Sequence, residues 1–183
     1  MTATSEPPLD ASPGDDERIT AAPAGSTTTP LGDAIDPDNF TPRLVSLLSN
    51  KLVWRESRLL RERFDLGTND WRIISALGTR PGATVTEIAD FIAVNKAIVS
   101  KSVAILLERG LVASSPLAGR SRPLYLTAEG AAMHAQMLPI SMSGQHYILD
   151  GLDAGEVERF NALLRAMLAR TDEPGFRGDG SDS

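Results

Sequence analysis

The chain has 183 residues, of which 42% are hydrophobic and 23% charged. This composition is typical of a globular protein with one domain and a sizeable core. It contains no cysteine, which excludes disulfides and thiolate redox chemistry and gives no support to a secreted protein. The longest apolar runs are too short to span a membrane, and the acidic N-terminus lacks the basic and apolar regions of a secretory signal. We therefore expect a cytoplasmic protein without membrane contact.

The formal net charge of −6 is distributed unevenly along the chain. Residues 1–40 carry a net charge of −7 and residues 171–183 one of −3, whereas residues 41–170 carry +4. The segment 1–38 is also rich in Pro, Ser, Thr, Gly and Asp, which is a disordered composition. We predict disordered acidic tails at 1–38 and 171–183 around one folded domain at 41–170. The N-terminal tail can be a solvated segment without a role, it can imitate DNA and weaken nonspecific binding, or it can add a dimer contact through the run ITAAPAG.

Two helices are predicted before the centre of the chain. Residues 41–64 have leucines at helical spacing, and Pro42 is tolerated in the first turn. Leu66 and Gly67 interrupt the pattern, after which Thr68 is the predicted cap of a shorter helix that ends near Gly78.

The stretch 84–112 predicts two short helices joined by a tight turn. Thr84 and Glu87 have the spacing of a capping box, and Asn95 is a strong N-cap residue for the second helix. Gly110 supplies the left-handed residue that commonly ends a helix. The second helix has one apolar stripe at helical spacing, which we expect to be buried: Val99, Val103, Leu106 and Leu107.

The opposite face of this second helix is small and basic. It carries Lys96, Ala97, Ser100, Lys101 and Ala104, and the first carboxylate is Glu108. Lysine can donate to guanine or phosphate, serine can bond to base edges, and alanine can contact a thymine methyl. Two lysines alone are equally consistent with a solvated helix face.

The segment that follows favours DNA binding. Residues 111–115 and 124–126 are predicted strands, separated by the loop PLAGRSRP with Arg120 and Arg122. A helix-turn-helix followed by a basic hairpin can place its second helix in the major groove while the hairpin, or wing, reaches phosphates or the minor groove.

Two further helices are predicted after the wing. Thr127 caps the first, which we expect to bend near Pro139 and to continue to about Leu149. Asp153 with Glu156 begins the last. The first and last helices both have broad apolar stripes without an obvious partner in the chain, so we expect them to form a dimerisation layer.

The whole order of motifs resembles the MarR family of bacterial transcriptional regulators. The similarity is carried by the runs LGTNDWRIISAL, VNKAIVSKSVAILLERGLV, LYLTAEGAAM and LDAGEVERFNALLRAMLA. It implies a mainly α (α+β) fold over residues 41–170, with a winged helix-turn-helix at 66–126 and dimerisation helices at 41–64 and 127–170. It also implies a homodimer that binds pseudo-palindromic double-stranded operators, represses genes and releases DNA when a small molecule binds. The residues predicted to contact DNA are Asn95, Lys96, Ala97, Ser100, Lys101, Arg120 and Arg122.

Two positions depart from the family pattern. The wing carries Gly119-Arg120-Ser121-Arg122 in place of an Asp-Arg-Arg core. The turn between the two central helices carries Ala93, where the family usually has a glycine; alanine there has a backbone cost if the position needs a positive φ.

Sites for small molecules and for catalysis are less marked in the sequence. Trp54, Arg58, Trp71 and His146 would suit an aromatic carboxylate effector, although tryptophans are more often core residues. The two histidines lack metal-ligand spacing, and there is no phosphate-binding loop or GxSxG motif. We expect no catalysis, no metal and no cofactor.

The sequence thus predicts a ligand-responsive, dimeric DNA-binding repressor. The alternative is a winged-helix module that binds protein without sequence-specific DNA binding. The dependence of affinity on salt discriminates the two, because a DNA binder releases counterions for each phosphate that it neutralises.

Overall fold

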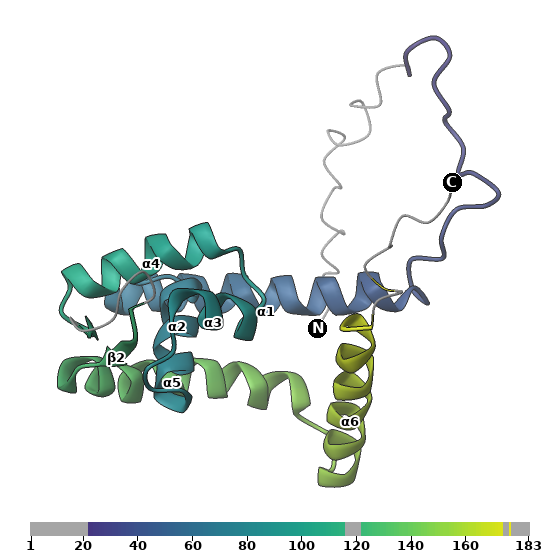
Figure 1. Ribbon diagram of the computed structural model, residues 1–183. Coiled ribbons are helices and arrows are strands. Elements are labelled where there is room, and N and C mark those ends of the chain that lie inside the picture. Colours follow the sequence, from purple (N-terminus) through teal and green to yellow (C-terminus); the bar gives the residue numbers. More distant parts are fainter. Residues whose placement is uncertain (1–21, 116–121, 174–175, 177–183) are drawn as a thin grey trace, which may run out of the picture. The chain divides into compact units, whose positions relative to one another are not determined.

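The computed structural model describes residues 22–115, 122–173 and 176. Its elements are α1 (Thr41–Phe64), α2 (Thr68–Thr79), α3 (Val85–Phe91), α4 (Lys96–Glu108), β1 (Val112–Ser114), β2 (Leu124–Leu126), α5 (Ala128–Leu149) and α6 (Ala154–Thr171), as Figure 1 shows. The predicted fold class, helices with a small antiparallel sheet, is confirmed. No described helix is long and apolar enough to cross a membrane.

The chain divides into two units, residues 1–44 and 45–183. In the first unit, described residues 22–40 carry no helix or strand and are exposed. Arg43 in the first turn of α1 donates a hydrogen bond to the carbonyl of Pro37 at 2.8 Å. Hydrogen bonds from the side chain of Asn39 and the N–H of Asp38 hold the pKa of Asp36 below its usual value.

The second unit has one core, formed mainly by α2, α4, the end of α1 and the middle of α5. Its largest fully buried side chains are Leu60, Leu66, Ile73, Ile74, Leu77, Ile88, Val99, Leu106 and Met137. Trp71 is 5% exposed and belongs to this core. Close packing of this kind holds α3 and α4 in a fixed position relative to the sheet.

Helix caps account for most of the boundaries. The Thr84 hydroxyl accepts a hydrogen bond from the N–H of Glu87, while the Glu87 carboxylate accepts from the N–H and the hydroxyl of Thr84. The hydrogen bond from the N–H of Thr84, and after it the one from the Thr84 hydroxyl, lower the pKa of Glu87 from its usual value. The side chains of Asn95, Thr127 and Asp153 each accept a backbone N–H at the start of α4, α5 and α6, so these predicted starts are confirmed.

The predicted cap of α2 is wrong. The N-cap residue is Gly67, and Thr68 is the first residue of the helix. The N–H of Gly67 donates to the carboxylate of Asp70 at 2.8 Å. The start of the helix is therefore capped by Asp70, three residues after Gly67, and not by Thr68. The hydroxyl of Thr68 is buried and lies 3.5 Å from the carbonyl of Val53 on α1.

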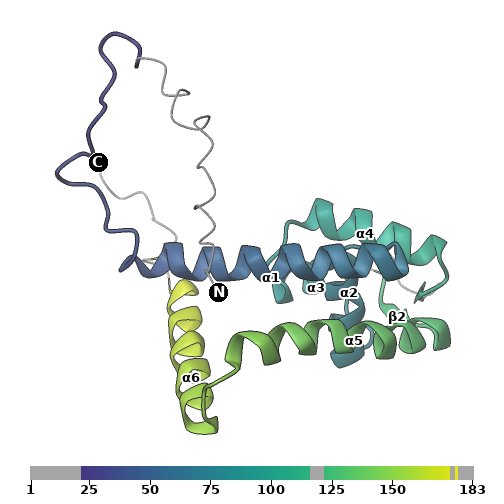
Figure 2. The ribbon, with the colours of Figure 1, turned by 180° about the vertical axis from the view of Figure 1, so that it is seen from behind.

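Helix α5 begins in close contact with the sheet. A Cβ atom at Gly130 would lie 2.0 Å from the carbonyl oxygen of Leu111, so only glycine fits there. The helix then continues across Pro139 to Leu149 as one element, which confirms the predicted end. Figure 2 shows α5 from behind, followed by α6.

The two strands pair antiparallel, with Val112 opposite Leu126 and Ser114 opposite Leu124. Strand β2 is also bonded on its other side: Gly82 donates to the carbonyl of Leu124 at 2.8 Å, and Leu124 donates to that of Ala83 at 3.1 Å. The base of the wing is therefore fixed to the connection between α2 and α3.

Candidate nucleic-acid interface and adjoining cavity

Helix α4 is held by its buried side and exposes the other. Val99, Val103 and Leu106 are buried as predicted, and Ser102 is buried beside them. Leu107, which was expected to be buried too, is 39% exposed, because the buried stripe turns toward Ser102 and away from position 107.

The exposed face of α4 consists of the residues that the sequence singled out. Lys96, Ala97, Ser100, Lys101 and Ala104 are all exposed, and Ile98 between them is 46% exposed. Asn95 is exposed as well, with its side-chain oxygen occupied by the N–H of Ala97 at 2.8 Å, so its amide N–H₂ group is what it can offer to a ligand. The face combines two cations with small side chains, which permits a close approach to a polyanion.

The turn before α4 is strained at one residue. Ala93 has a φ of 51°, in the left-handed region where side chains are disfavoured. The N–H of Val94 donates to the carbonyl of Ala89 at 3.0 Å, which closes the turn. Ala93 therefore has the positive φ at which the backbone cost of alanine was expected.

The wing is described only in part. Arg122 is exposed two residues before β2, and Arg120 lies outside the described residues. Arg109, which adds to the positive charge of the segment, has a different role in the structure. Its guanidinium donates to the carbonyls of Phe64 at 3.0 Å and Asp65 at 2.9 Å. It therefore caps the C-terminal end of α1, where a cation is favourable.

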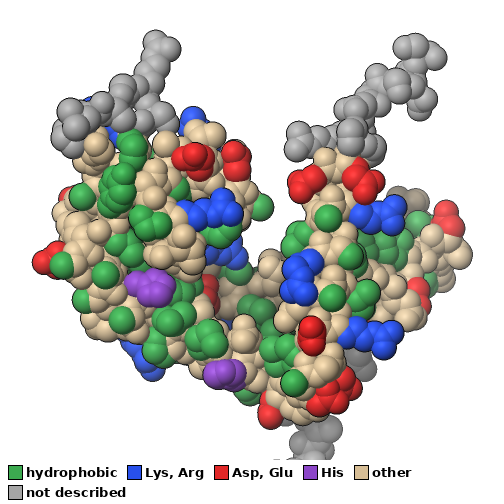
Figure 3. Space-filling model, turned by 60° about the horizontal axis from the view of Figure 1, so that its bottom comes forward, with side chains coloured by type: hydrophobic (Ala, Val, Ile, Leu, Met, Phe, Trp, Pro, Cys, Tyr) green, Lys and Arg blue, Asp and Glu red, His purple; other side chains and the backbone are tan. Residues whose placement is uncertain are grey.

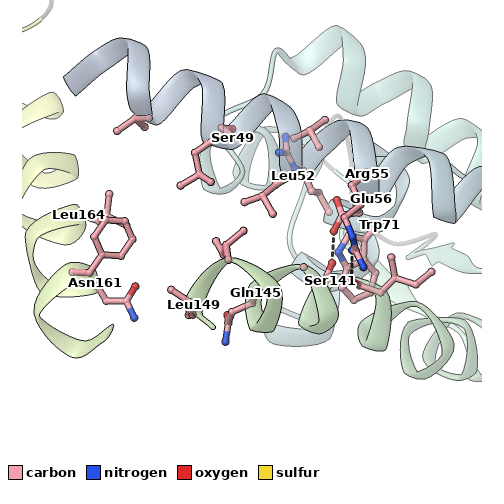
Figure 4. A pocket seen from close by; sticks show the side chains of 18 residues that line it. Ser49, Leu52, Arg55, Glu56, Trp71, Ser141, Gln145, Leu149, Asn161 and Leu164 are labelled. Atoms are coloured by element: carbon pink, nitrogen blue, oxygen red, sulfur yellow. Dashed lines mark hydrogen bonds between the residues drawn. The ribbon is translucent and has the colours of Figure 1, made fainter. Parts of the chain in front are cut away.

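A cavity of about 490 Å³ lies between α1, α2, α5 and α6. Figure 4 shows its walls, and Figure 3 shows a face of the molecule with a hollow bordered by hydrophobic side chains. Most of its lining is apolar and is drawn from all four helices: Val45, Leu48, Leu52, Val53, Trp71, Ile140, Ile148, Leu149, Phe160 and Leu164. Such a lining suits an organic molecule with a ring or a chain.

Two charged residues of α1 that line this cavity make hydrogen bonds with α5. Arg55 donates to the carbonyl of Ile140 at 3.3 Å and to the hydroxyl of Ser143 at 2.9 Å. The neighbouring Glu56 accepts a short hydrogen bond from the hydroxyl of Ser141 (Figure 4). Arg72 also lines the cavity, and its side chain has no hydrogen bond or ion pair among the described residues. Two guanidinium groups against one carboxylate give this lining a net positive charge.

The four residues predicted for an effector do not share one site. Only Trp71 lines the cavity. Trp54 is 70% exposed and outside its lining, and Arg58 points to solvent, 3.6 Å from Glu62 in an ion pair between exposed side chains. His146 is exposed and also outside the lining. Arg55, Glu56 and Arg72 were not among the four predicted residues, because charged residues are frequent along α1 and α2 and no sequence pattern singles these three out.

No group of three or more His, Cys, Asp or Glu side chains within the described part of the chain is placed to hold a metal ion.

The fold and the exposed basic face of α4 thus define a winged helix-turn-helix protein. Residues 64–121 match the model of the MarR family. The chain is 31% identical to transcriptional regulator HosA of Escherichia coli over 114 residues, which cover 61% of this chain and 84% of the relative. The chain therefore belongs to the MarR family, whose members are transcriptional regulators.

Solved structures show the same fold. A MarR/EmrR family regulator from Acinetobacter sp. ADP1 superimposes with a TM-score of 0.69 at 24% identity, covering 75% of this chain and 99% of the other. BpsR of Bordetella bronchiseptica, whose structure is described as the mechanism for regulation of its DNA binding by 6-hydroxynicotinic acid, superimposes with a TM-score of 0.63 at 20% identity, covering 74% and 98%.

Proposed function

We propose that this chain is a sequence-specific DNA-binding repressor that binds a pseudo-palindromic operator as a homodimer. The observation that carries the proposal is the exposed face of α4, with Lys96, Ser100 and Lys101 beside small side chains and no carboxylate before Glu108. In this arrangement α4 enters the major groove, and Arg122 at the base of the wing reaches the adjacent backbone or minor groove. Arg120 is proposed as the second wing contact.

The homodimer is supported by apolar side chains that this chain leaves uncovered. Helix α6 has no buried residue, although it carries a broad stripe of apolar side chains. Large exposed hydrophobic side chains occur on α1, α5 and α6, namely Val45, Leu47, Leu48, Leu138, Met142, Ile148, Phe160, Leu163, Met167 and Leu168. A second copy of the chain is the partner that we propose for this surface, since apolar surfaces of this extent mark interfaces.

The basic face is tested by replacing its lysines. The chain has three lysines, and Lys51 on α1 is exposed like Lys96 and Lys101, so Lys51→Ala is a matched control. We expect Lys96→Ala and Lys101→Ala each to weaken binding by roughly 1–3 kcal/mol where the lysine reads a base. Where it reads phosphate, the slope of log K against log salt should become shallower by about 1. The measurement is fluorescence anisotropy of a labelled duplex at several salt concentrations.

Equal affinities of all three variants and the parent protein would remove α4 as the recognition helix. A binding partner that is a protein, held by a mainly apolar interface, would show little salt dependence and would favour the alternative interaction module.

We propose further that a small aromatic or carboxylate effector binds the cavity and shifts the spacing of the two α4 helices away from the operator. The support is the apolar lining, the Arg72 side chain, which has no hydrogen bond or ion pair within the described part of the chain, and the regulation of DNA binding of BpsR by 6-hydroxynicotinic acid. Guanidinium groups bind carboxylates in a planar, two-bonded geometry.

The probe for this site is 6-hydroxynicotinic acid, titrated by calorimetry. Arg72→Ala should weaken its binding about tenfold, the loss of roughly one charged hydrogen bond, because the guanidinium would bind the carboxylate. Arg58→Ala is the control, since Arg58 lies outside the cavity. Failure of the parent protein to bind the acid, or an equal loss in both variants, would contradict an aromatic-acid effector in this cavity.

A further inference from the structure

Trp71 lines the cavity and also contacts His134 on α5. Its side chain lines the cavity and is 5% exposed. Its ring lies against that of His134 on α5, with centroids 5.2 Å apart and planes inclined by 37°. A molecule that moves the indole must therefore also move the imidazole, because close-packed side chains transmit displacement.

His134 faces a second, smaller hollow of about 360 Å³. Tyr125 and Leu126 of β2 line it, together with the end of α2 at Leu77 and Gly78. The imidazole lies over Gly78, where a Cβ atom would be 3.5 Å from the ring. His134 is thus the side chain that lies against Trp71 and also shares a hollow with the strand at the base of the wing.

Strand β2 connects this hollow to the proposed DNA contact. Arg122 precedes β2 by two residues, and β2 is hydrogen-bonded to both β1 and the connection between α2 and α3. Tyr125 also covers Gly82, since a Cβ atom there would lie 3.0 Å from its hydroxyl. Displacement of β2 therefore shifts Arg122 at the base of the wing together with the connection that precedes α3.

We propose that His134 is a positioning residue that couples the cavity to the wing through Trp71 on one side and β2 on the other. The inference rests on the proposed function, because it assigns a route to the regulation described there. Coupling between two sites is reciprocal in free energy. DNA bound at the wing must therefore change the surroundings of Trp71, even when the cavity holds no effector.

Trp71 itself can report this change. The chain has two tryptophans, and the exposed Trp54 can be replaced, so that Trp54→Phe leaves Trp71 as the single source of indole emission. The full-length protein is titrated with a labelled random-sequence duplex at low ionic strength, where nonspecific binding is strong. Anisotropy of the label reports binding, and emission of Trp71 reports its surroundings.

We expect emission and anisotropy to change with the same midpoint. Adding His134→Leu should reduce the emission change roughly twofold or more while binding persists, and His134→Phe should restore it because a ring again packs on Trp71. His146→Leu is the control, since His146 is exposed on α5 and lines neither hollow.

Binding without any change in Trp71 emission, or an unaltered change in the His134→Leu protein, would overturn the coupling and leave the proposed function intact. Absence of binding by anisotropy would overturn the proposed function, and the coupling with it.

Discussion

At the scale of single residues, the helix-turn-helix contains one residue in an unfavourable backbone conformation. Ala93 has a φ of 51° in the turn that sets the angle between α3 and α4. Capping on both sides of the turn, by Thr84 and Asn95, holds the helices that enclose it. The strain is therefore supported by the surrounding hydrogen bonds and by the buried stripe of α4.

Replacing Ala93 with glycine should stabilise the protein. Relief of the left-handed strain is worth about 1–2 kcal/mol, and the greater freedom of glycine in the unfolded chain offsets about 0.5–1 kcal/mol of this gain. The control is Ala104→Gly, at an exposed position inside α4, which should destabilise by about 1 kcal/mol. Urea unfolding followed by circular dichroism measures both. A less stable Ala93→Gly protein would show that the turn is not strained at this residue.

At the scale of elements, the position of α5 depends on a glycine in its first turn. Any side chain at Gly130 would overlap the carbonyl of Leu111, which lies directly before β1. The same carbonyl accepts a hydrogen bond from the N–H of Thr127 at 3.1 Å, so the start of α5 cannot move away without losing it. This contact joins α5 to the base of the wing.

Gly130→Ala should lower the free energy of unfolding by about 1–3 kcal/mol, as expected for overpacking against rigid backbone. Gly78→Ala is the matched control, because Gly78 is also helical but its added Cβ atom meets only His134 at 3.5 Å. That variant should be neutral or up to about 1 kcal/mol more stable, from helix propensity. Thermal unfolding of the two variants should show opposite shifts; equal shifts would contradict the close approach.

The elements were largely predictable from sequence because their signals are local. Capping residues lie three positions apart, and apolar stripes follow the helix period, so the ends of α3, α4, α5 and α6 followed from spacing. Thr68 was misjudged because Asp70 also satisfies the start of α2. The exposure of Leu107 and the capping role of Arg109 depend on tertiary packing, which spacing does not record.

The exposed face of α4 and the cavity were predictable from sequence to different degrees. The face of α4 comes from one continuous segment, so the residues exposed on it could be identified together. The cavity draws its lining from four helices, and Arg55, Glu56 and Arg72 become neighbours only after folding. No local pattern distinguishes them from the solvated Arg58.

At the scale of the whole molecule, charge and apolar surface are distributed in a way that suits a dimeric DNA binder. Residues 41–170 carry a net charge of +4 within a chain of net charge −6, so the acidic residues outweigh the basic ones only outside this range. Helix α6 exposes Leu163 at 55% and Leu168 at 64%. These features predict that two copies associate through helices outside the winged unit and present two basic faces to one duplex.

Selection of bound duplexes from a random pool, with the purified full-length protein at near-physiological salt, tests this account most directly. We expect an inverted repeat whose half-sites are centred about one helical turn apart, roughly 34–36 Å, because two copies of α4 would read successive major grooves. The Lys96→Ala and Lys101→Ala variants should enrich this sequence less strongly than the parent protein, whereas Lys51→Ala should enrich it equally. Recovery of no preferred sequence by the folded protein would contradict sequence-specific binding through α4.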